Sequence, residues 1–232
     1  MGPSVPSQPA DLSRWTPRPL PPTTPMRGRT VIVERLDPSR HADDLAAVFL
    51  ATPDAAWDFL PYGPYRDEAP VRAWLASIAP KSDPLFHAII DARTNLPAGL
   101  AALMRIDPAN GVIEVGHIHF GPTLKQTPAA TEAIFLLMTR VFDELGYRRL
   151  EWKCNARNAA SRNAALRFGF TYEGTFRQAA IVKGVNRDTA WFSLLDQEWP
   201  AMKTAFNRWL DPDNFDPSGR QRRPLSAIAK HP

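Results

Sequence analysis

The stretch GVIEVGHIHFGPTLKQTPAATEAIFLLMTRVFDEL, residues 111–145, decides the fold of this chain. Its first part is a β-type apolar run that ends at Gly121-Pro122, and its last part has the apolar spacing of a helix. The first four backbone N–H groups of a helix lack intrahelical partners, and the helix dipole adds about half a positive charge at that end. The stretch therefore predicts a strand, a polar loop and a helix start that can hold a phosphate.

The composition bounds the class of protein. The 232 residues are 44% hydrophobic, which is enough for one sizeable core and leaves little for a second domain. No apolar run reaches the length of a membrane span, and the first residues lack the order of a signal peptide. The single cysteine, Cys154, excludes an internal disulfide and a multi-cysteine metal site. We expect one α/β domain in the cytoplasm, with no membrane partner and no metal.

The two ends of the chain differ from its middle. Residues 1–27 hold eight prolines, which predicts a leader that is extended or disordered, with Trp15 as a candidate anchor. The formal charge of +4 is modest, and residues 211–232 form a basic C-terminal tail that is more typical of a solvated end than of a nucleic-acid interface. Nucleic acid is therefore not the expected partner. An anionic cofactor is equally compatible with this charge balance.

The order of the remaining elements predicts alternating strands and helices. An aromatic loop, residues 54–65, suits either the wall of a substrate site or a hydrophobic plug. Besides the central strand 112–120 and the helix that follows it, strands are expected at 29–37, 85–91, 99–106, 149–155, 170–182 and 188–195, and helices at 41–51, 67–79, 158–168 and 198–210.

Several local strings resemble the GNAT N-acetyltransferases, and within them the RimJ/RimL-type branch. The strings are Glu114-Val115-Gly116, Thr131-Glu132-Ala133, Asn158-Ala159-Ala160-Ser161, Phe168-Gly169-Phe170, Glu173-Gly174 and Asn186-Arg187-Asp188. The resemblance implies a GNAT-like α/β fold over residues 28–210, with a central mixed, mostly antiparallel sheet of about seven strands and helices on both faces. It also implies transfer of an acetyl group from acetyl-CoA to a primary amine. A homodimer is compatible with it.

The phosphate loop of the family usually reads Gln or Arg, two residues, Gly, one residue, then Gly or Ala. Here proline stands at the middle glycine, which removes one N–H donor, although proline suits the first position of a helix. A hydrogen bond to a charged group contributes about 1.5–3 kcal/mol, and the lysine of the loop offsets part of that loss. The resemblance implies that coenzyme A is held by Lys125, Gln126, Thr127, Pro128, Ala129 and Ala130, with backbone donors at Gln126, Thr127, Ala129 and Ala130.

Acetyl transfer needs a neutral amine, donors for an oxyanion and a proton for the departing thiolate. For the base, Glu114 on the central strand is the first candidate, acting through water, and His117 and His119 are reserves. The alternative for Glu114 is an exposed carboxylate that shares a face with Gly116. In the closing hairpin, where RimL-type enzymes carry a carboxylate, this chain has Ala180, which leaves Glu173 as a further candidate base.

The resemblance assigns the remaining roles. Ser161 matches the Asn-x-x-Ser serine of the family, which the resemblance places at the coenzyme sulfur, and the alternative is a polar residue on the surface of its helix. The tyrosine that many GNAT enzymes use there corresponds to Ala165 and is absent. Asn158 would cap its helix and touch the pantetheine arm, and a backbone N–H near Ile118 or His119 would donate to the oxyanion.

Some roles stay open in the sequence. Cys154 is interpreted as a buried, inert thiol. Asp188 is either a turn residue or a group that orients the amine. The acceptor is a protein N-terminus, a polyamine-like metabolite or an aminoglycoside-like drug.

Two other functions remain compatible with the sequence. Pro128 and Ala180 depart from the family pattern, which keeps open a non-catalytic acyl-CoA-binding regulatory module. A nucleic-acid binder with a basic tail would show affinity that falls steeply with salt.

Overall fold

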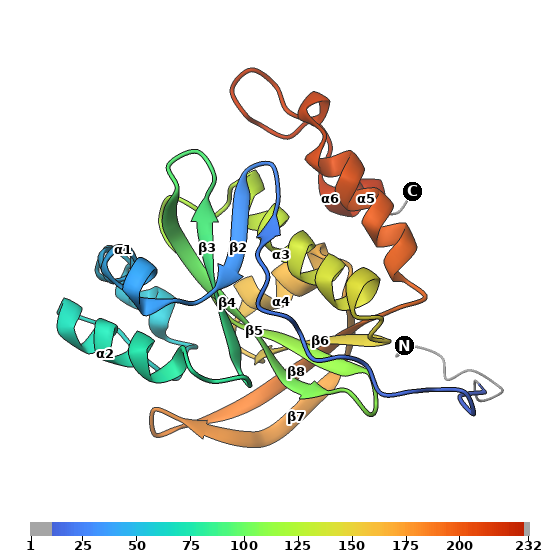
Figure 1. Cartoon of the computed structure of the whole chain (residues 1–232), viewed down its shortest axis with the longest axis horizontal. Coiled ribbons are helices and arrows are strands. Elements are labelled where there is room, and N and C mark those ends of the chain that lie inside the picture. The colour runs from blue at the N-terminus through green and yellow to red at the C-terminus, as the bar shows by residue number, and fades with distance from the viewer. Residues whose placement is uncertain (1–10, 230–232) are drawn as a thin grey trace. The chain divides into compact units, whose positions relative to one another are not determined.

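The computed structural model of this chain describes residues 11–229, so parts of the predicted leader and tail lie outside it. The chain forms two compact units. Among the described residues, unit 1 holds 11–20, 107–113 and 145–229, and unit 2 holds 21–106 and 114–144. Figure 1 shows the elements of both units coloured along the chain.

Unit 2 is built on five strands that neighbour one another in chain order. They are β1 (Met26–Arg27), β2 (Val31–Arg35), β3 (Leu85–Asp91), β4 (Leu96–Asp107) and β5 (Val112–Phe120). The pairs β1–β2, β2–β3 and β3–β4 are antiparallel. Six consecutive residues of β3, from Leu85 to Ile90, are buried. A strand buried along its length has both faces covered, because successive side chains point to opposite faces.

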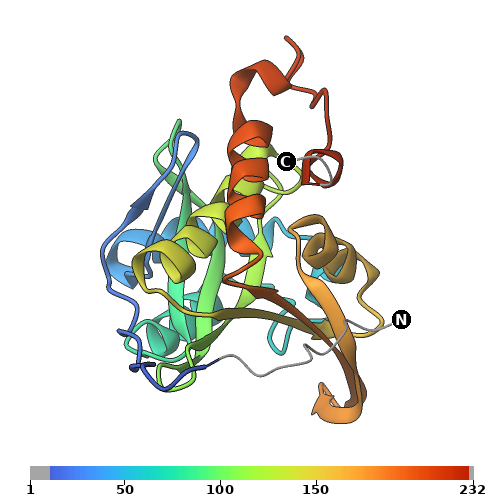
Figure 2. The same cartoon turned by 90° about the vertical axis from the view of Figure 1, so that its right-hand side faces the viewer.

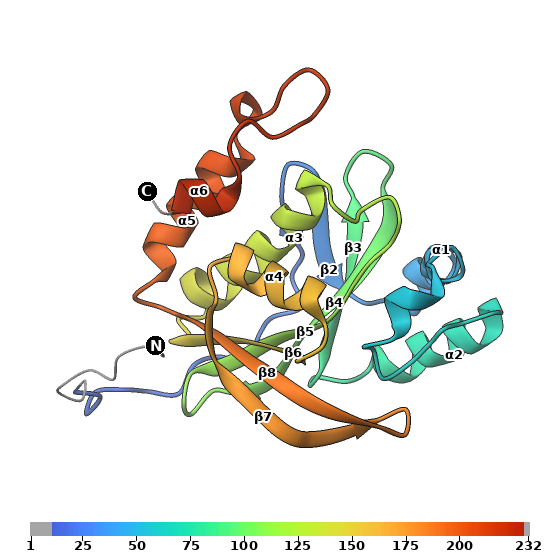
Figure 3. The same ribbon diagram turned by 180° about the vertical axis from the view of Figure 1, so that it is seen from behind.

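Helices cover both faces of the unit 2 strands, as expected. α1 (Pro38–Leu50) and α2 (Glu68–Ile78) lie on the opposite side of these strands from α3 (Pro128–Thr139) (Figures 1 and 3). Phe49 and Leu75 are fully buried, and they belong to one apolar cluster with Phe86 of β3. Burial of each such side chain contributes about 1.5–3 kcal/mol, so this cluster fixes α1 and α2 on the sheet.

Unit 1 contains three strands in the spatial order β6-β8-β7. They are β6 (Arg149–Asn155), β7 (Thr171–Val182) and β8 (Val185–Leu195), with α4 (Ala159–Arg167) between β6 and β7 along the chain. Both pairs are antiparallel, and β7 and β8 form the long hairpin seen in Figure 2. The described residues thus hold eight strands, against about seven expected, and the additional strand is the two-residue β1.

The leader is anchored in unit 1 by Trp15. Its indole Nε1 donates to the carbonyl of Ala109 at 2.7 Å, and the Arg18 guanidinium lies 4.1 Å from the centre of its ring. Gly111 has φ +63°, and a Cβ at this position would overlap the Trp15 ring. Glycine is therefore required there both by the backbone conformation and by the close approach of the indole.

Residues 211–229 pack within unit 1. They follow α5 (Trp199–Leu210) and form a 3-10 turn, η3 (Pro212–Asn214), and a short helix, α6 (Leu225–Ala229), that returns to α5 (Figure 2). Leu225 and Ile228 are buried. Residues 217–224, which hold the basic run, are exposed, in agreement with a solvated end, but this expectation is wrong for Leu225 and Ile228, whose apolar side chains supply a packing face. None of the described helices is long and apolar enough to cross a membrane.

Candidate functional site

The start of α3 has the loop geometry that anion binding requires. Thr127 is the N-cap, and its hydroxyl accepts from the N–H of Ala130 at 3.3 Å. Gln126 has φ +63°, and Pro128 occupies the first helical turn. The N–H of Thr127 donates to the carbonyl of Leu124 at 3.2 Å. The loop therefore turns sharply just before the helix, and the first backbone N–H groups of α3 follow this turn.

The expected set of backbone donors is corrected by these contacts. Thr127 and Ala130 already have partners within the chain, and the N–H of Lys125 donates to Gly121 at 2.9 Å. No described residue accepts from the N–H of Gln126 or Ala129. With the exposed Lys125 side chain and the helix dipole, these two amides fit an anionic diphosphate. Pro128 removes a donor from the position between them.

Glu114 of β5 is a buried carboxylate with a charged partner. Its Oε2 lies 2.7 Å from Nη1 of Arg105, whose side chain is 57% exposed. A Cβ at Gly116 would lie 3.5 Å from Oε1 of Glu114, so the two residues share a face, as the alternative for Glu114 held. The same alternative also took Glu114 to be exposed, and this is wrong, because the residue is only 3% exposed.

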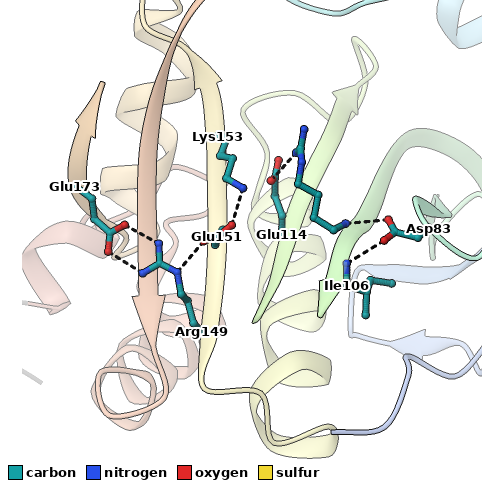
Figure 4. Close-up of polar contacts among 8 residues, drawn as sticks. Asp83, Ile106, Glu114, Arg149, Glu151, Lys153 and Glu173 are labelled. Atoms are coloured by element: carbon teal, nitrogen blue, oxygen red, sulfur yellow. Dashed lines mark hydrogen bonds and ion pairs between the residues drawn. The ribbon is translucent and has the colours of Figure 1, made fainter. Parts of the chain in front are cut away.

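Arg105 is held in place by backbone contacts of its own. It has φ +47°, and its N–H donates to Asp83 Oδ1 at 2.8 Å, while the N–H of Ile106 donates to Oδ2 at 3.0 Å (Figure 4). The sequence reading missed Arg105. The signal for it was present, because Arg105 and Glu114 face each other across the predicted hairpin turn.

His119 is a packed histidine. Its Nε2 lies 3.1 Å from the Thr52 hydroxyl, which gives its own proton to the carbonyl of Val48, so Nε2 is the donor. The ring stacks on Trp57 at 4.5 Å. Burial, with a smaller effect of the Lys125 charge, lowers the pKa of His119 to about 4. The side chain is therefore a poor base at neutral pH, and only its backbone N–H stays a candidate for the oxyanion.

His117 interrupts the regular geometry of β5. Its φ is +50°, which is unusual for a residue with a Cβ and marks a local distortion of the strand. The centre of its ring lies 4.9 Å from the centre of the Phe86 ring and 5.7 Å from that of the Tyr62 ring. Ile118, the other expected oxyanion donor, follows directly. The distortion thus lies directly before the two residues to which the resemblance assigns the oxyanion donor.

The inner part of the aromatic loop is a hydrophobic plug, which is one of its two expected readings. Trp57 is 1% exposed and packs between Phe49 and His119, which makes it a plug. Tyr62 lies further out, between the rings of Trp74 and His117. The inner part of the loop therefore belongs to the core, and Tyr62 contacts the distorted segment of β5.

In unit 1, Asn158 and Ser161 meet at the start of α4. Asn158 Oδ1 accepts from the N–H of Ser161 at 3.0 Å, which is the expected cap. Ser161 Oγ accepts from Nε1 of Trp152 at 3.0 Å. Because an indole N–H is only a donor, Trp152 does not use the hydroxyl proton of Ser161, which can be given to a sulfur such as that of Cys154. Ala165 is fully buried.

Cys154 lies at the end of β6 beside the same serine. The thiol is free and buried. Burial raises its pKa, and a hydrogen bond with the Ser161 hydroxyl opposes this effect. A thiol with a raised pKa is a weak nucleophile at neutral pH, which agrees with the interpretation of Cys154 as inert.

Glu173 is ruled out as a free base by its partners. Both of its oxygens pair with Arg149, at 2.7 and 2.6 Å, and the Ser193 hydroxyl donates to Oε1 at 2.6 Å. The Arg149 guanidinium lowers the pKa of Glu173. Arg149 also contacts Glu151, which pairs with Lys153, so four charges form a ladder on unit 1 (Figure 4). The expectation of Glu173 as a substitute base is therefore wrong.

Asp188 braces the closing hairpin. Its Oδ1 accepts from the N–H of Gln178 at 2.7 Å and from Nδ2 of Asn186 at 3.1 Å. Gln178 has φ +51°, inside the segment where the β7–β8 register shifts. These contacts agree with the turn reading of Asp188. Ala180 is exposed on β7, and within the described residues no group of His, Cys, Asp or Glu could hold a metal ion.

The chain was compared with known families and structures. The family model for the acetyltransferase (GNAT) domain matches residues 31–171. The crystal structure of a GCN5-related N-acetyltransferase from Brucella melitensis has a TM-score of 0.92 at 49% identity, covering 94% of this chain and 100% of that chain. This likeness confirms the predicted fold.

Two further relatives are named for ribosomal substrates. A Bacillus subtilis (strain 168) protein, YdaF, whose name assigns it to the ribosomal N-acetyltransferases, is 30% identical over 105 residues, or 45% of this chain. The chain spans 57% of the length of that relative. RimL, named as a ribosomal L7/L12 alpha-N-protein acetyltransferase in complex with coenzyme A, has a TM-score of 0.62 at 22% identity, covering 74% of this chain and 98% of that chain. At this identity the likeness concerns the fold alone.

Proposed function

The chain belongs to the GNAT family of acetyltransferases, and from this premise we propose that it acetylates the primary amine of a protein N-terminus or a small molecule by direct attack. Acetyl-CoA is the donor used by this fold, and when bound it supplies the thioester carbonyl that the amine attacks. The observation that carries the proposal is the helix start of α3, where two amides lack partners among the described residues. The name of the Bacillus subtilis relative, a ribosomal N-acetyltransferase, favours an amine of a ribosomal protein as the acceptor.

Candidate contacts to coenzyme A occur in each unit. In unit 2 these are the N–H groups of Gln126 and Ala129, the Lys125 ammonium, and the backbone of β5 at Ile118 and His119. In unit 1, Asn158 would contact the pantetheine arm through its amide Nδ2, since its Oδ1 already caps α4. Thr127, Pro128 and Ala130 shape the loop rather than donate to the diphosphate.

Glu114 is the proposed base and acts through a water. Its position on β5 supports this role, because a carboxylate with a fixed orientation can hold a water in place for proton transfer. Arg105 fixes that orientation through Oε2. Oε1 is the oxygen that would accept the proton from the water.

Ser161 is the proposed acid. Trp152 donates to its oxygen and thereby directs the hydroxyl proton away from the indole. A donor aimed at the sulfur would stabilise the thiolate as it leaves. The Cys154 thiol lies next to the Ser161 hydroxyl, but its pKa is raised by burial, so it keeps its own proton.

The test measures thiol release from acetyl-CoA with a panel of amines. The panel contains short peptides with free N-termini, spermidine and an aminoglycoside, and calorimetry measures coenzyme A affinity in parallel. We expect binding and turnover with at least one amine. Binding without turnover would favour the non-catalytic acyl-CoA-binding module, and failure to bind coenzyme A at millimolar concentration would remove the proposal.

A further inference from the structure

Tyr62 has a buried hydroxyl for which the described residues supply no hydrogen-bond partner. Its ring lies 4.2 Å from the ring of Trp74 and 5.7 Å from that of His117. A buried hydroxyl without a partner costs about 1–3 kcal/mol, and most buried hydroxyls in proteins have one. The position of this hydroxyl therefore points to a partner that does not belong to the fold.

The surroundings of Tyr62 place it beside the proposed reaction centre. His117 carries the distortion of β5, and the next two residues, Ile118 and His119, are the proposed oxyanion donors. Tyr62 is also held in place from the other side. Gly63 has φ +66°, and a Cβ there would overlap the buried ring of Trp57. The backbone next to Tyr62 is thus held close to Trp57, whose ring centre lies 6.1 Å from that of Tyr62.

The chemistry of the phenol and its neighbours defines what it would bind. Burial raises the pKa of Tyr62, so the phenol keeps its proton and is a donor at all working pH values. The rings around it are the indoles of Trp57 and Trp74 and the imidazole of His117. Such walls favour an apolar body, and the hydroxyl favours an acceptor oxygen within that body.

We propose that the Tyr62 hydroxyl donates a hydrogen bond to an oxygen next to the reacting amine, and so selects acceptors that carry such an oxygen. This inference rests on the proposed acetyl transfer. Tyr62 is a positioning residue in this account, since it binds the acceptor and takes no part in proton transfer. A site built to hydrogen-bond a substrate oxygen discriminates against an analogue that lacks it.

The test compares two acceptors that differ in one group. Phenylalaninamide carries a carbonyl oxygen beside its amine, and phenethylamine lacks it. In the wild type we expect the higher kcat/KM with phenylalaninamide. Tyr62→Phe should lower that value about three- to tenfold, mainly through KM, and leave phenethylamine unchanged, since one neutral hydrogen bond is removed. An equal loss with both amines, or no loss, overturns the inference.

Two controls separate this role from a structural one. Tyr65→Phe removes a hydroxyl from the same loop, where the ring packs 5.5 Å from Trp57, and should leave the ratio of the two amines unchanged. Tyr62→Phe should not lower Tm, because its hydroxyl has no partner to lose among residues 11–229. A lower Tm would show that the hydroxyl holds the structure and would overturn the inference.

The proposed function can fail separately. A wild type that acetylates other amines of the panel but neither of these two refutes only the role of Tyr62. A wild type that binds coenzyme A and acetylates no amine refutes acetyl transfer, and the role of Tyr62 falls with it.

Discussion

At Glu114 a carboxylate is buried in β5 beside a guanidinium that is more than half exposed. The arrangement lets the carboxylate remain in an apolar strand, because a buried charge without a partner is costly. Both the stability and the proposed reaction therefore depend on the same group. Substitutions at the two partners separate these effects.

Glu114→Gln should lower turnover about 100-fold, the size of a typical general-base contribution, with unchanged coenzyme A affinity. Arg105→Gln should remove the charged partner of Glu114 and destabilise the fold by about 1–2 kcal/mol, less than for a fully buried pair because Arg105 is exposed. Steady-state kinetics, calorimetry and denaturant unfolding measure the three quantities. Unchanged turnover in Glu114→Gln would mean that another group accepts the proton.

Ser161→Ala should lower turnover more than coenzyme A affinity, because it removes the proposed acid and leaves the α3 loop intact. It also leaves the Trp152 indole without its acceptor, at a cost of about 1 kcal/mol or more. Trp152→Phe is the matched control, since it removes the indole donor and keeps the hydroxyl. If both variants lose the same turnover, the effect is structural and Ser161 is not the acid.

His119 predicts a pH dependence of stability. Its pKa in the folded state is about 4, below the unfolded value of about 6.5, so its contribution is complete above pH 6.5 and is lost as pH falls toward 4. His119→Gln keeps a donor for Thr52. It should reduce the slope of the unfolding free energy against pH in this window by at most about 1.4 kcal/mol per pH unit. Because the pKa of buried His87 is also about 4, part of the wild-type slope should remain. Parallel curves for variant and wild type would contradict the assignment.

At the scale of elements, the segment after α5 is held by one buried amide. Asn214 Nδ2 donates to the carbonyls of Trp209 and Arg223, at 3.0 and 3.1 Å, and its Oδ1 accepts from the N–H of Arg223 at 3.0 Å. These bonds close the loop that brings α6 onto α5. A five-residue helix is not stable alone, so its packing depends on this closure.

Asn214→Ala should therefore release α6. We expect a loss of about 2–3 kcal/mol, from three hydrogen bonds of about 1 kcal/mol each, and faster proteolysis after Leu210. Asp213→Ala, an exposed neighbour in the same turn, is the control and should change neither quantity. Equal protease resistance of both variants would show that the packing of Leu225 and Ile228 is sufficient.

At the scale of the whole molecule, donor binding and folding are linked, since a ligand that binds only the folded chain raises its Tm. At 100 times Kd the stabilisation is about 2.7 kcal/mol. A charge at the start of α3 affects the stability of the ligand-free fold and the affinity for coenzyme A in opposite directions. A carboxylate there stabilises the helix and repels a diphosphate.

Ala129→Asp tests this opposition. The partly exposed side chain should raise the free energy of unfolding of the ligand-free protein by about 0.3–1 kcal/mol, which would be seen as a slightly higher Tm. It should also lower the affinity for coenzyme A at least tenfold. Ala129→Asn adds the same volume without charge and serves as the control. A thermal shift by coenzyme A as large in Ala129→Asp as in the wild type would mean that the diphosphate binds elsewhere.

The bounds of β3, β5 and β6 could be read from the sequence, because alternating or continuous apolar runs between turn residues are local signals. The helix N-cap at Asn158 and the family were accessible in the same way. β1 and α6 were missed, since two and five residues are too short to carry a period. Their existence depends on contacts made elsewhere in the chain.

The sequence by itself determined the GNAT fold, the loop before α3 and the candidate positions Glu114 and Ser161. Only the tertiary structure decided which polar groups have partners. Arg105 pairs with Glu114, and Arg149 pairs with Glu173. Tyr62 has a buried hydroxyl with no partner among the described residues. The physical reason is that pattern and propensity act over neighbouring residues. Pairing of charges and satisfaction of buried polar atoms depend on side chains that meet only after the chain has folded.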